Sequence, residues 1–470
     1  MPIKLALPKG RLLGETATLL HKVGWGLSGY HEGARFYHLK SLRFPNLRAK
    51  VFHEKDIPIQ VAVGNYDLGI CGLDWVEELL VKYPSSAVVK VKNLSYGANV
   101  LYIAASQSVG ASVREEILEK SDIVRVASEY PNLAESFAVS RRLKRFSIFP
   151  LWGAAEVYPP ESADLALISA GAEGELVSYG LVSVSKILDS NACLIANAGS
   201  WVTKDLSEVL NCLEEELPVA EELPSSVDAA RAPEIAGQHL ATEVDEDVVW
   251  FALPDGHQQL PTLQLLSRAG IQIGDNSENR RPTTNLAGLM IKLIRPQDMP
   301  LQVANGNFDL AITGRDWLRE HLYQFPSSPV QEFLNLKSGK VRIVAVVSKD
   351  LLVDDVSSLR QLNAERLLPL RVASEYVNIA DKYARDNHLG QYRIIPTWGA
   401  SEAFVPEDAD LLVENTQTGR TIARHNLKII DTLFESTACL IGRADGQSNS
   451  TKVKRVESII EMLRVAVEDI

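Results

Sequence analysis

The feature that most constrains the fold of this chain is an internal repeat. LALPKG begins at residue 5 and returns as FALPDG at 251, and RVASEYPNLAESFA at 125 returns as RVASEYVNIADKYA at 371, so both pairs are 246 residues apart. Between them, KDIPIQVAVGNYDLGICGLDW at 55 returns as QDMPLQVANGNFDLAITGRDW at 297, which is 242 residues later. Self-similarity at a nearly fixed offset predicts a tandem duplication.

The two copies are predicted to cover residues 1–215 and 247–470. Residues 216–246 are rich in Glu, Ala and Pro, which is typical of a linker. A chain of 470 residues is too long for a single hydrophobic core, and each copy is long enough to fold as a domain.

Composition limits the class of protein. Charged residues make up 23% and hydrophobic residues 46% of the chain, values usual for a soluble globular protein. The net charge of −12 disfavours a nucleic-acid or anionic-membrane partner, because both need a basic surface. No apolar stretch approaches the roughly 18 residues of a membrane helix, and the N-terminus lacks the pattern of a signal peptide. We therefore expect a cytoplasmic protein.

Within each copy, short runs rich in β-branched residues alternate with helical patterns. IKLALP is typical of a strand, and LLGETATLLHKVG of a helix that ends at Gly24. This alternation predicts an α/β fold with mostly parallel sheets. Ligands of such folds bind at the carboxyl ends of strands, so the loops that follow strands are candidate sites.

One such loop is the polar segment ENTQTGRTIARHN, which follows the apolar run 411–413. Gly419 allows close approach of the backbone, the hydroxyls of Thr418 and Thr421 lie beside amide groups, and Arg420 adds a positive charge. These features suit a phosphate monoester, and the upstream Asp410 and Glu414 would accept hydrogen bonds from sugar hydroxyls. The alternative is a turn whose threonine caps the next helix.

Several motifs together resemble one family. LALPKGRLLGETATLL, GNYDLGICGLDW with GNFDLAITGRDW, ASEYPNLA, WGASE, TGRT and STACLIG are similar to the motifs of ATP phosphoribosyltransferases, which begin histidine biosynthesis. The resemblance covers nearly all of both copies. It implies two α/β lobes around a cleft in each copy, as in type II periplasmic binding proteins. It also implies transfer of a phosphoribosyl group from phosphoribosyl pyrophosphate to N1 of ATP, with Mg²⁺ present.

The resemblance further implies roles for particular residues. The ribose 5′-phosphate would bind at Thr416 and at 418–421, and Glu414 would bind the ribose hydroxyls. Lys9 and Arg11 would lie near the polyphosphates as catalytic cations. Nucleotide contacts are expected at Arg35, Arg48, Arg295, Glu156 and Glu402. The Mg²⁺ ion would be held mainly by substrate phosphates, and no metal ligand is assigned in the chain.

The copies differ at the expected site. In copy 1 the phosphoribosyl loop reads ISAGAEGELVSYG, with Ile168 in place of Glu414 and negative charge at Glu173 and Glu175. Like charge repels a phosphate, so this loop is not expected to bind phosphoribosyl pyrophosphate. Conversely, copy 2 has Asp255 where copy 1 has Lys9. Neither copy carries a complete set of site residues.

Three alternatives follow. Copy 1 cations complete the copy 2 loop across an internal pseudo-dimer, or copy 2 works alone, or the protein is a non-catalytic nucleotide-binding regulatory paralogue. A solute-binding protein is a further alternative, disfavoured because no export signal is seen. We favour the composite site. The expected partners are ATP and phosphoribosyl pyrophosphate, further copies of the chain in a homo-oligomer, and a regulatory subunit resembling histidyl-tRNA synthetase.

Overall fold

The computed structural model describes residues 2–31, 37–108, 123–214, 247–274, 280–444 and 450–468. The strands of these residues form four sheets, two in each copy. We name the corresponding lobes 1A (strands β1–β5 and β11), 1B (β6–β10), 2A (β12–β15 and β21) and 2B (β16–β20). The α/β fold with two lobes per copy is confirmed, while the linker predicted at 216–246 lies outside the described residues.

Lobes 1A and 2A correspond to each other. In 1A the strand order is β2-β3-β1-β4-β11-β5, and in 2A it is β13-β12-β14-β21-β15. The strands of 1A are β1 (Ile3–Lys9), β2 (His38–Lys40), β3 (Leu47–His53), β4 (Leu68–Gly72), β5 (Val88–Asn93) and β11 (Ala192–Asn197). Its helices are α1 (Leu13–Lys22), α2 (Asp56–Ala62), α3 (Leu73–Lys82), α7 (Ala198–Thr203) and α8 (Ser207–Glu214). The strands of 2A are β12 (Val249–Pro254), β13 (Leu289–Ile294), β14 (Leu310–Gly314), β15 (Val330–Asn335) and β21 (Ala438–Arg443). Its helices are η2 (Gly256–Gln258), α9 (Gln259–Arg268), α10 (Met299–Ala304), α11 (Arg315–Gln324) and α15 (Ser450–Glu468).

Lobes 1B and 2B also correspond, with strand orders β10-β6-β9-β7-β8 and β18-β17-β19-β16-β20. Lobe 1B contains β6 (Asn99–Ser106), β7 (Val124–Ser128), α5 (Pro131–Ser140), β8 (Phe146–Pro150), η1 (Ala155–Val157), β9 (Leu165–Ala170), α6 (Glu173–Ser178) and β10 (Leu181–Ser190). Lobe 2B contains β16 (Val341–Ser348), α12 (Val356–Ala364), β17 (Leu370–Ser374), α13 (Val377–Asp386), β18 (Tyr392–Pro396), η3 (Ser401–Phe404), β19 (Leu411–Thr416), α14 (Arg420–Arg424) and β20 (Leu427–Ser436). None of the helices described by the model is long and apolar enough to cross a membrane.

The prediction of mostly parallel sheets is only partly correct. In lobe 1A, β1 is parallel to β3 and β4, but β11 is antiparallel to both β4 and β5. The chain passes from lobe 1A to lobe 1B through β5 and β6 and returns through β10 and β11. As a result, β11 is antiparallel to its neighbours in 1A, and β6 is antiparallel to its neighbours in 1B. The sheets are therefore mixed, and the parallel strands β1, β3 and β4 carry the loops nearest the other copy.

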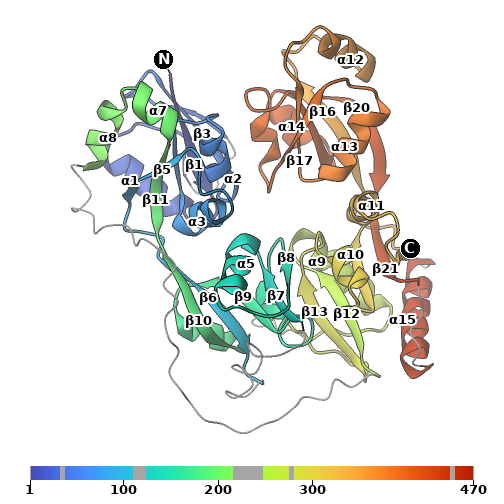
Figure 1. Cartoon of the computed structure of the whole chain (residues 1–470). Helices are drawn as coiled ribbons and strands as arrows, with labels where there is room; N and C mark the ends of the chain where they lie inside the picture. Colours follow the sequence, from blue (N-terminus) through green and yellow to red (C-terminus); the bar gives the residue numbers. More distant parts are fainter. Residues whose placement is uncertain are drawn as a thin grey trace.

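The two copies pack crosswise, so that lobe 1A meets 2B and lobe 1B meets 2A (Figure 1). One buried cluster joins Phe52 of 1A to Phe404 of 2B, whose rings meet edge to face at 5.2 Å. A second cluster joins Tyr158 of 1B to Met299 and Phe308 of 2A. Each copy therefore buries part of its apolar surface only against the other copy.

Buried lysines mark equivalent positions in the two junctions. Lys50 of 1A donates to Glu407 and Asp408 of 2B at 3.0 and 2.8 Å. In the other junction Lys292 of 2A, which is fully buried, donates to Glu161 of 1B at 2.8 Å. A buried ammonium is tolerated only when paired, so these contacts fix how the lobes are placed against each other.

Within each copy a buried aspartate ties the two lobes together. Asp74 at the start of α3 accepts hydrogen bonds from the hydroxyls of Tyr130 and Ser190 in lobe 1B. Asp316 at the start of α11 accepts the equivalent bonds from Tyr376 and Ser436 of lobe 2B. These residues hold the lobes of a copy in a fixed relation.

Truncating the aromatic contact between the copies tests the crosswise packing. We expect Phe404→Ala to lower the free energy of unfolding by about 3–5 kcal/mol, because it leaves a cavity in a core shared by 1A and 2B. Denaturant unfolding followed by circular dichroism should show one transition for the whole chain, displaced to lower denaturant. Leu352→Ala, at a side chain that is 98% exposed, should leave it unchanged. Two separate transitions, with only one displaced, would contradict the shared core.

Candidate functional site

The polar loop of copy 2 leaves the carboxyl end of β19. Glu414 and Thr416 are buried, and the Thr416 hydroxyl accepts a hydrogen bond from the N–H of Gly419 at 2.9 Å. Gly419 has φ of 73°, a left-handed conformation that costs glycine little. The turn leaves the side chains of Thr418 and Thr421 exposed. The loop therefore presents two exposed hydroxyl groups, with a glycine in a left-handed conformation between them, at the carboxyl end of β19.

Lobe 1A supplies side chains to the same place, which we call the 1A/2B junction. The ring of Tyr37 stacks on that of His425, the residue after α14, with centroids 4.8 Å apart and planes at 21°. The ammonium of Lys9, at the end of β1, lies 5.6 Å from the centroid of the Tyr37 ring. The pKa of Tyr37 is raised to about 12 by burial and by the negative charges of Glu402 and Glu414. The structure therefore brings Lys9, Glu402 and Glu414 together from two copies.

Three carboxylates of lobe 2B influence one another in this junction. Burial, together with repulsion from Glu402, raises the pKa of Glu375 to about 7, while Lys9 opposes the rise. Burial also raises the pKa of Glu414 well above its ordinary value, and Glu375 and Glu402 add to the effect. Such a group favours ligands that bring hydroxyl donors or positive charge. On the 1A side, burial and then nearby cations lower the pKa of His53 to about 4, so this imidazole is neutral.

The equivalent 1B/2A junction has a different arrangement of charge. The carbonyl of Tyr37 accepts a hydrogen bond from Val51, and the carbonyl of Arg280 accepts one from Leu293, so Arg280 occupies the place of Tyr37. Arg280 contacts Glu156 at 2.8 Å and Asp255, the counterpart of Lys9, at 2.7 Å.

Two further charged residues of the 1B/2A junction, Arg295 and Glu175, also have partners within it. Arg295 contacts Asp255 at 3.3 Å. The Glu175 carboxylate accepts hydrogen bonds from its own loop, from the N–H of Gly171 and the hydroxyl of Tyr179. The two arginines of this junction thus pair with Glu156 and Asp255, and Ile168 stands in place of Glu414.

Some predicted site residues lie elsewhere. Asp410 precedes β19 and accepts hydrogen bonds from Arg366 and Arg371, so it is a strand length, roughly 20 Å, from the loop. Its contact with sugar hydroxyls stays a prediction, and in this structure the carboxylate is paired with the two arginines. Arg48 is the second residue of β3, at the end of the strand opposite the junction, where its guanidinium donates a hydrogen bond to the carbonyl of Pro45.

Arg11 is also placed differently from the prediction. It contacts Glu54 at 3.1 Å and Asp74 at 3.6 Å, both in copy 1, so its charge is already paired. Glu156 and Arg295, predicted to bind nucleotide, both belong to the 1B/2A junction. Arg35 lies outside the described residues.

The sequence did not identify Tyr37, His425 or Glu375 as site residues. His425 and Glu375 lie within the segments ARHN and SEYVN, and neither residue was singled out by the sequence analysis. Tyr37 follows a segment without a recognisable pattern, so only its contact across the copies reveals it.

Metal binding by the protein alone is not supported. The described ranges contain no group of three or more His, Cys, Asp or Glu side chains arranged to hold a metal ion. Although Glu375, Glu402 and Glu414 influence one another, they do not form such a group.

Comparison with known proteins gives a consistent result. A family model described as ATP phosphoribosyltransferase matches residues 53–217 and again 295–465, once in each copy. The ATP phosphoribosyltransferase of Trichlorobacter lovleyi is 31% identical over 221 residues, which are 47% of this chain and 73% of that protein. That of Geotalea daltonii is 31% identical over 222 residues, with the same coverage. The solved ATP phosphoribosyl transferase (HisG:HisZ) complex from Thermotoga maritima is 22% identical, with a TM-score of 0.39, over 47% of this chain and 100% of that one.

The raised pKa of Glu375 predicts a pH-dependent loss of stability. Between the ordinary carboxyl pKa and about 7, the folded protein keeps a proton that the unfolded chain releases, so the free energy of unfolding falls as pH rises. Glu375→Gln removes this loss. We expect the variant to gain stability relative to the parent, on the order of 1 kcal/mol, between pH 5 and pH 8, measured by denaturant titration at both pH values.

Glu129→Gln provides the matched control. Glu129 is the counterpart of Glu375 and accepts a hydrogen bond from Lys55 at 2.9 Å, so its replacement breaks an ion pair and should bring no gain at pH 8. A stability difference between Glu375→Gln and the parent that stays constant over this pH range would show that Glu375 does not titrate there.

Proposed function

The chain belongs to the ATP phosphoribosyltransferase family, and we propose that it carries out this transfer at one composite site, the 1A/2B junction. The proposed reaction joins N1 of ATP to C1 of phosphoribosyl pyrophosphate and releases pyrophosphate, the first step of histidine biosynthesis. The enzyme class follows from the family. The single site per chain is the part of the proposal that depends on this structure.

One observation carries the composite site. Tyr37 of copy 1, which has Lys9 beside its ring, stacks on His425, four residues after Thr421, whereas the cations of the other junction pair with Glu156 and Asp255. A phosphate needs unpaired donors and positive charge, and the first junction offers the exposed hydroxyls of Thr418 and Thr421 and the ammonium of Lys9, for which no ion pair is found among the described residues. This supports the composite site over a site made by copy 2 alone.

The chemistry requires electrostatic stabilisation rather than a nucleophilic side chain. We propose that the backbone and hydroxyls of 418–421 hold the ribose 5′-phosphate and that Glu414 accepts hydrogen bonds from the ribose hydroxyls. Lys9 would neutralise the leaving diphosphate as the bond between C1 and oxygen breaks and the electron pair leaves with pyrophosphate.

We propose that the three carboxylates of the junction act in the same step. Positive charge develops on the ribose ring as the C1–oxygen bond breaks, and it passes to the adenine ring once N1 has bonded. Glu375, Glu402 and Glu414 would stabilise this charge, and the stacked rings of Tyr37 and His425 offer an apolar wall for the base. Their mutual repulsion in the free protein would be relieved by the cationic transition state.

Magnesium fits this site as an ion bound to the diphosphate. Because the described residues form no protein cage, we propose that Mg²⁺ enters with phosphoribosyl pyrophosphate, which satisfies the ion's preference for phosphate oxygens and water. When bound, it would neutralise negative charge on the leaving group, as Lys9 does. A regulatory subunit and a homo-oligomer stay predictions. Activity of the chain alone would show that no other subunit is required, and its dependence on protein concentration would test for a homo-oligomer.

Substitutions on both sides of the junction test the composite site. We expect Lys9→Ala and Thr421→Ala each to lower the turnover rate by about 100-fold, the size seen when one electrostatic donor is removed. Formation of phosphoribosyl-ATP is followed by its absorbance. Glu175→Gln, at the counterpart of Thr421 in the 1B/2A junction, should retain activity. Full activity of Lys9→Ala alongside inactive Thr421→Ala would mean that copy 2 works alone.

Removal of the metal tests the role of Mg²⁺. We expect EDTA in excess to abolish phosphoribosyl-ATP formation and added MgCl₂ to restore it, without any change in the unfolding midpoint, because the ion is carried by substrate and not by the fold. A lower unfolding midpoint in EDTA would instead indicate a structural metal site in the chain.

A further inference from the structure

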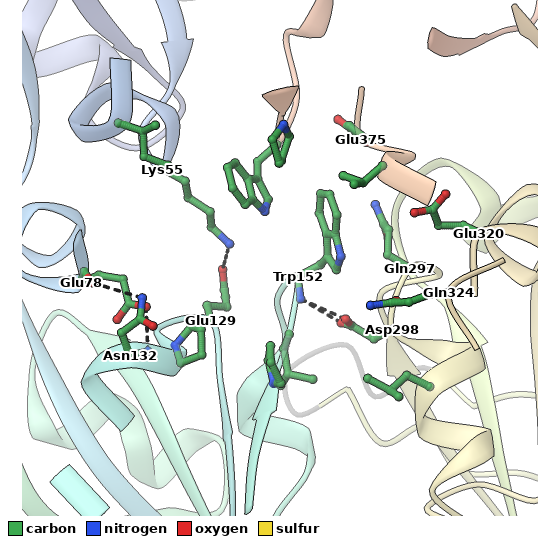
Figure 2. A pocket seen from close by; sticks show the side chains of 18 of the residues that line it. Lys55, Glu78, Glu129, Asn132, Trp152, Gln297, Asp298, Glu320, Gln324 and Glu375 are labelled. Carbon is green, nitrogen blue, oxygen red and sulfur yellow. Dashed lines mark hydrogen bonds and ion pairs between the residues drawn. The ribbon is translucent and has the colours of Figure 1, made fainter. Parts of the chain in front are cut away.

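A cavity of about 970 Å³ lies where all four lobes meet. Each lobe contributes one tryptophan to its lining: Trp75, Trp152, Trp317 and Trp398. Figure 2 shows its charged and amide side chains, with Trp152 near the centre. The volume lies within the range of small-molecule sites, and the cavity is distinct from the loop at 416–421, which does not line it.

The lining of the cavity has more acidic than basic side chains, which disfavours a phosphorylated ligand. Five acidic side chains face two lysines: Glu78, Glu129, Asp298, Glu320 and Glu375 against Lys55 and Lys82. His321 adds no charge near neutral pH, because burial lowers its pKa to about 4. An acidic, aromatic cavity favours a positively charged ligand over a phosphate.

The copy 1 half of the cavity already contains such a cation. The ammonium of Lys55 lies 4.8 Å from the centroid of the Trp75 ring. It also donates a hydrogen bond to Glu129 at 2.9 Å (Figure 2). The Lys55 ammonium is thus stabilised both by a cation–π contact and by an ion pair.

The copy 2 half keeps the aromatic ring and the carboxylate but has no lysine at the position equivalent to Lys55. The counterparts of Trp75 and Glu129 are Trp317 and Glu375, while Gln297 stands in place of Lys55. Within the described part of the chain, no hydrogen bond or ion pair to the Glu375 carboxylate is found, and the buried Oε1 of Gln297 has no donor. Glu375 and Trp317 are thus the counterparts of the two groups that contact Lys55 in copy 1, and the Trp317 ring also contacts Tyr376 and Trp152.

We propose that the copy 2 half of the central cavity binds a small organic cation that carries N–H donors, such as an amine or an amidine. Its N–H groups would donate to Glu375 and to Gln297 Oε1, and its charge would lie against Trp317, as Lys55 lies against Trp75. The ligand thus takes the place of a side chain that one copy has and the other lacks. This inference shares Glu375 with the catalytic proposal, but its test needs neither substrate, so the two can fail separately.

Benzamidinium chloride is a suitable probe, because it joins a flat ring to a cation with N–H donors. Titration calorimetry without substrates should show one molecule bound per chain, with affinity at least about tenfold above that of benzamide, its uncharged analogue. Benzoate, the anionic analogue, should not bind. Failure of benzamidinium to bind, or equal binding of benzamide, would overturn the proposal.

Two substitutions locate the probe. Gln297→Lys restores the residue found in copy 1, so its ammonium should pair with Glu375 and weaken benzamidinium binding at least about tenfold. Glu375→Gln removes the carboxylate and should have the same effect, and it decides the question if circular dichroism shows that Gln297→Lys does not fold. Gln331→Lys adds the same charge on an exposed strand of 2A and should leave binding unchanged. Undiminished binding in both cavity variants would also overturn the proposal.

Discussion

Crosswise burial of apolar surface is the constraint on which the other features depend. Phe52 of lobe 1A and Phe404 of lobe 2B belong to one core, and Tyr158 of 1B packs with Met299 of 2A in another. Since neither copy can bury these faces alone, the hydrophobic effect selects the crossed arrangement over two separate domains. That arrangement, and not nearness in the chain, places His425 of copy 2 against Tyr37 of copy 1, with Lys9 beside the Tyr37 ring.

In the 1B/2A junction, ion pairs between the copies stabilise the contact of the two lobes. Asp255 in place of Lys9 would leave a carboxylate beside Glu156, but Arg280 stands where Tyr37 stands in the first junction and contacts both. One substitution is thereby matched by another, and the lobes stay in contact without a ligand. The same fold therefore carries one junction with charges left for a substrate and one whose charges satisfy each other.

The sequence predicted much of this architecture because the duplication is visible in it. The α/β class, the two copies, the helix that ends before Gly24 and the turn at Gly419 all depend on local patterns, and the structure agrees with them. Residues that depend on strand direction were harder. Asp410 and Arg48 have suitable chemistry, but each lies at the end of its strand away from the junction, and this distinction needs the sheet. The pairing of Tyr37 with His425 needs the packing of one copy on the other.

The joining of both copies in one chain has a consequence for mutation. In a homodimer with twofold symmetry, every substitution occurs twice, once in each equivalent interface, so a change that helps one interface is imposed on the other. Here Lys55 and Gln297 occupy equivalent positions but differ, as do Lys9 and Asp255. A single polypeptide can thus give its two halves separate duties, with one retaining turnover while the other is free to acquire a different ligand.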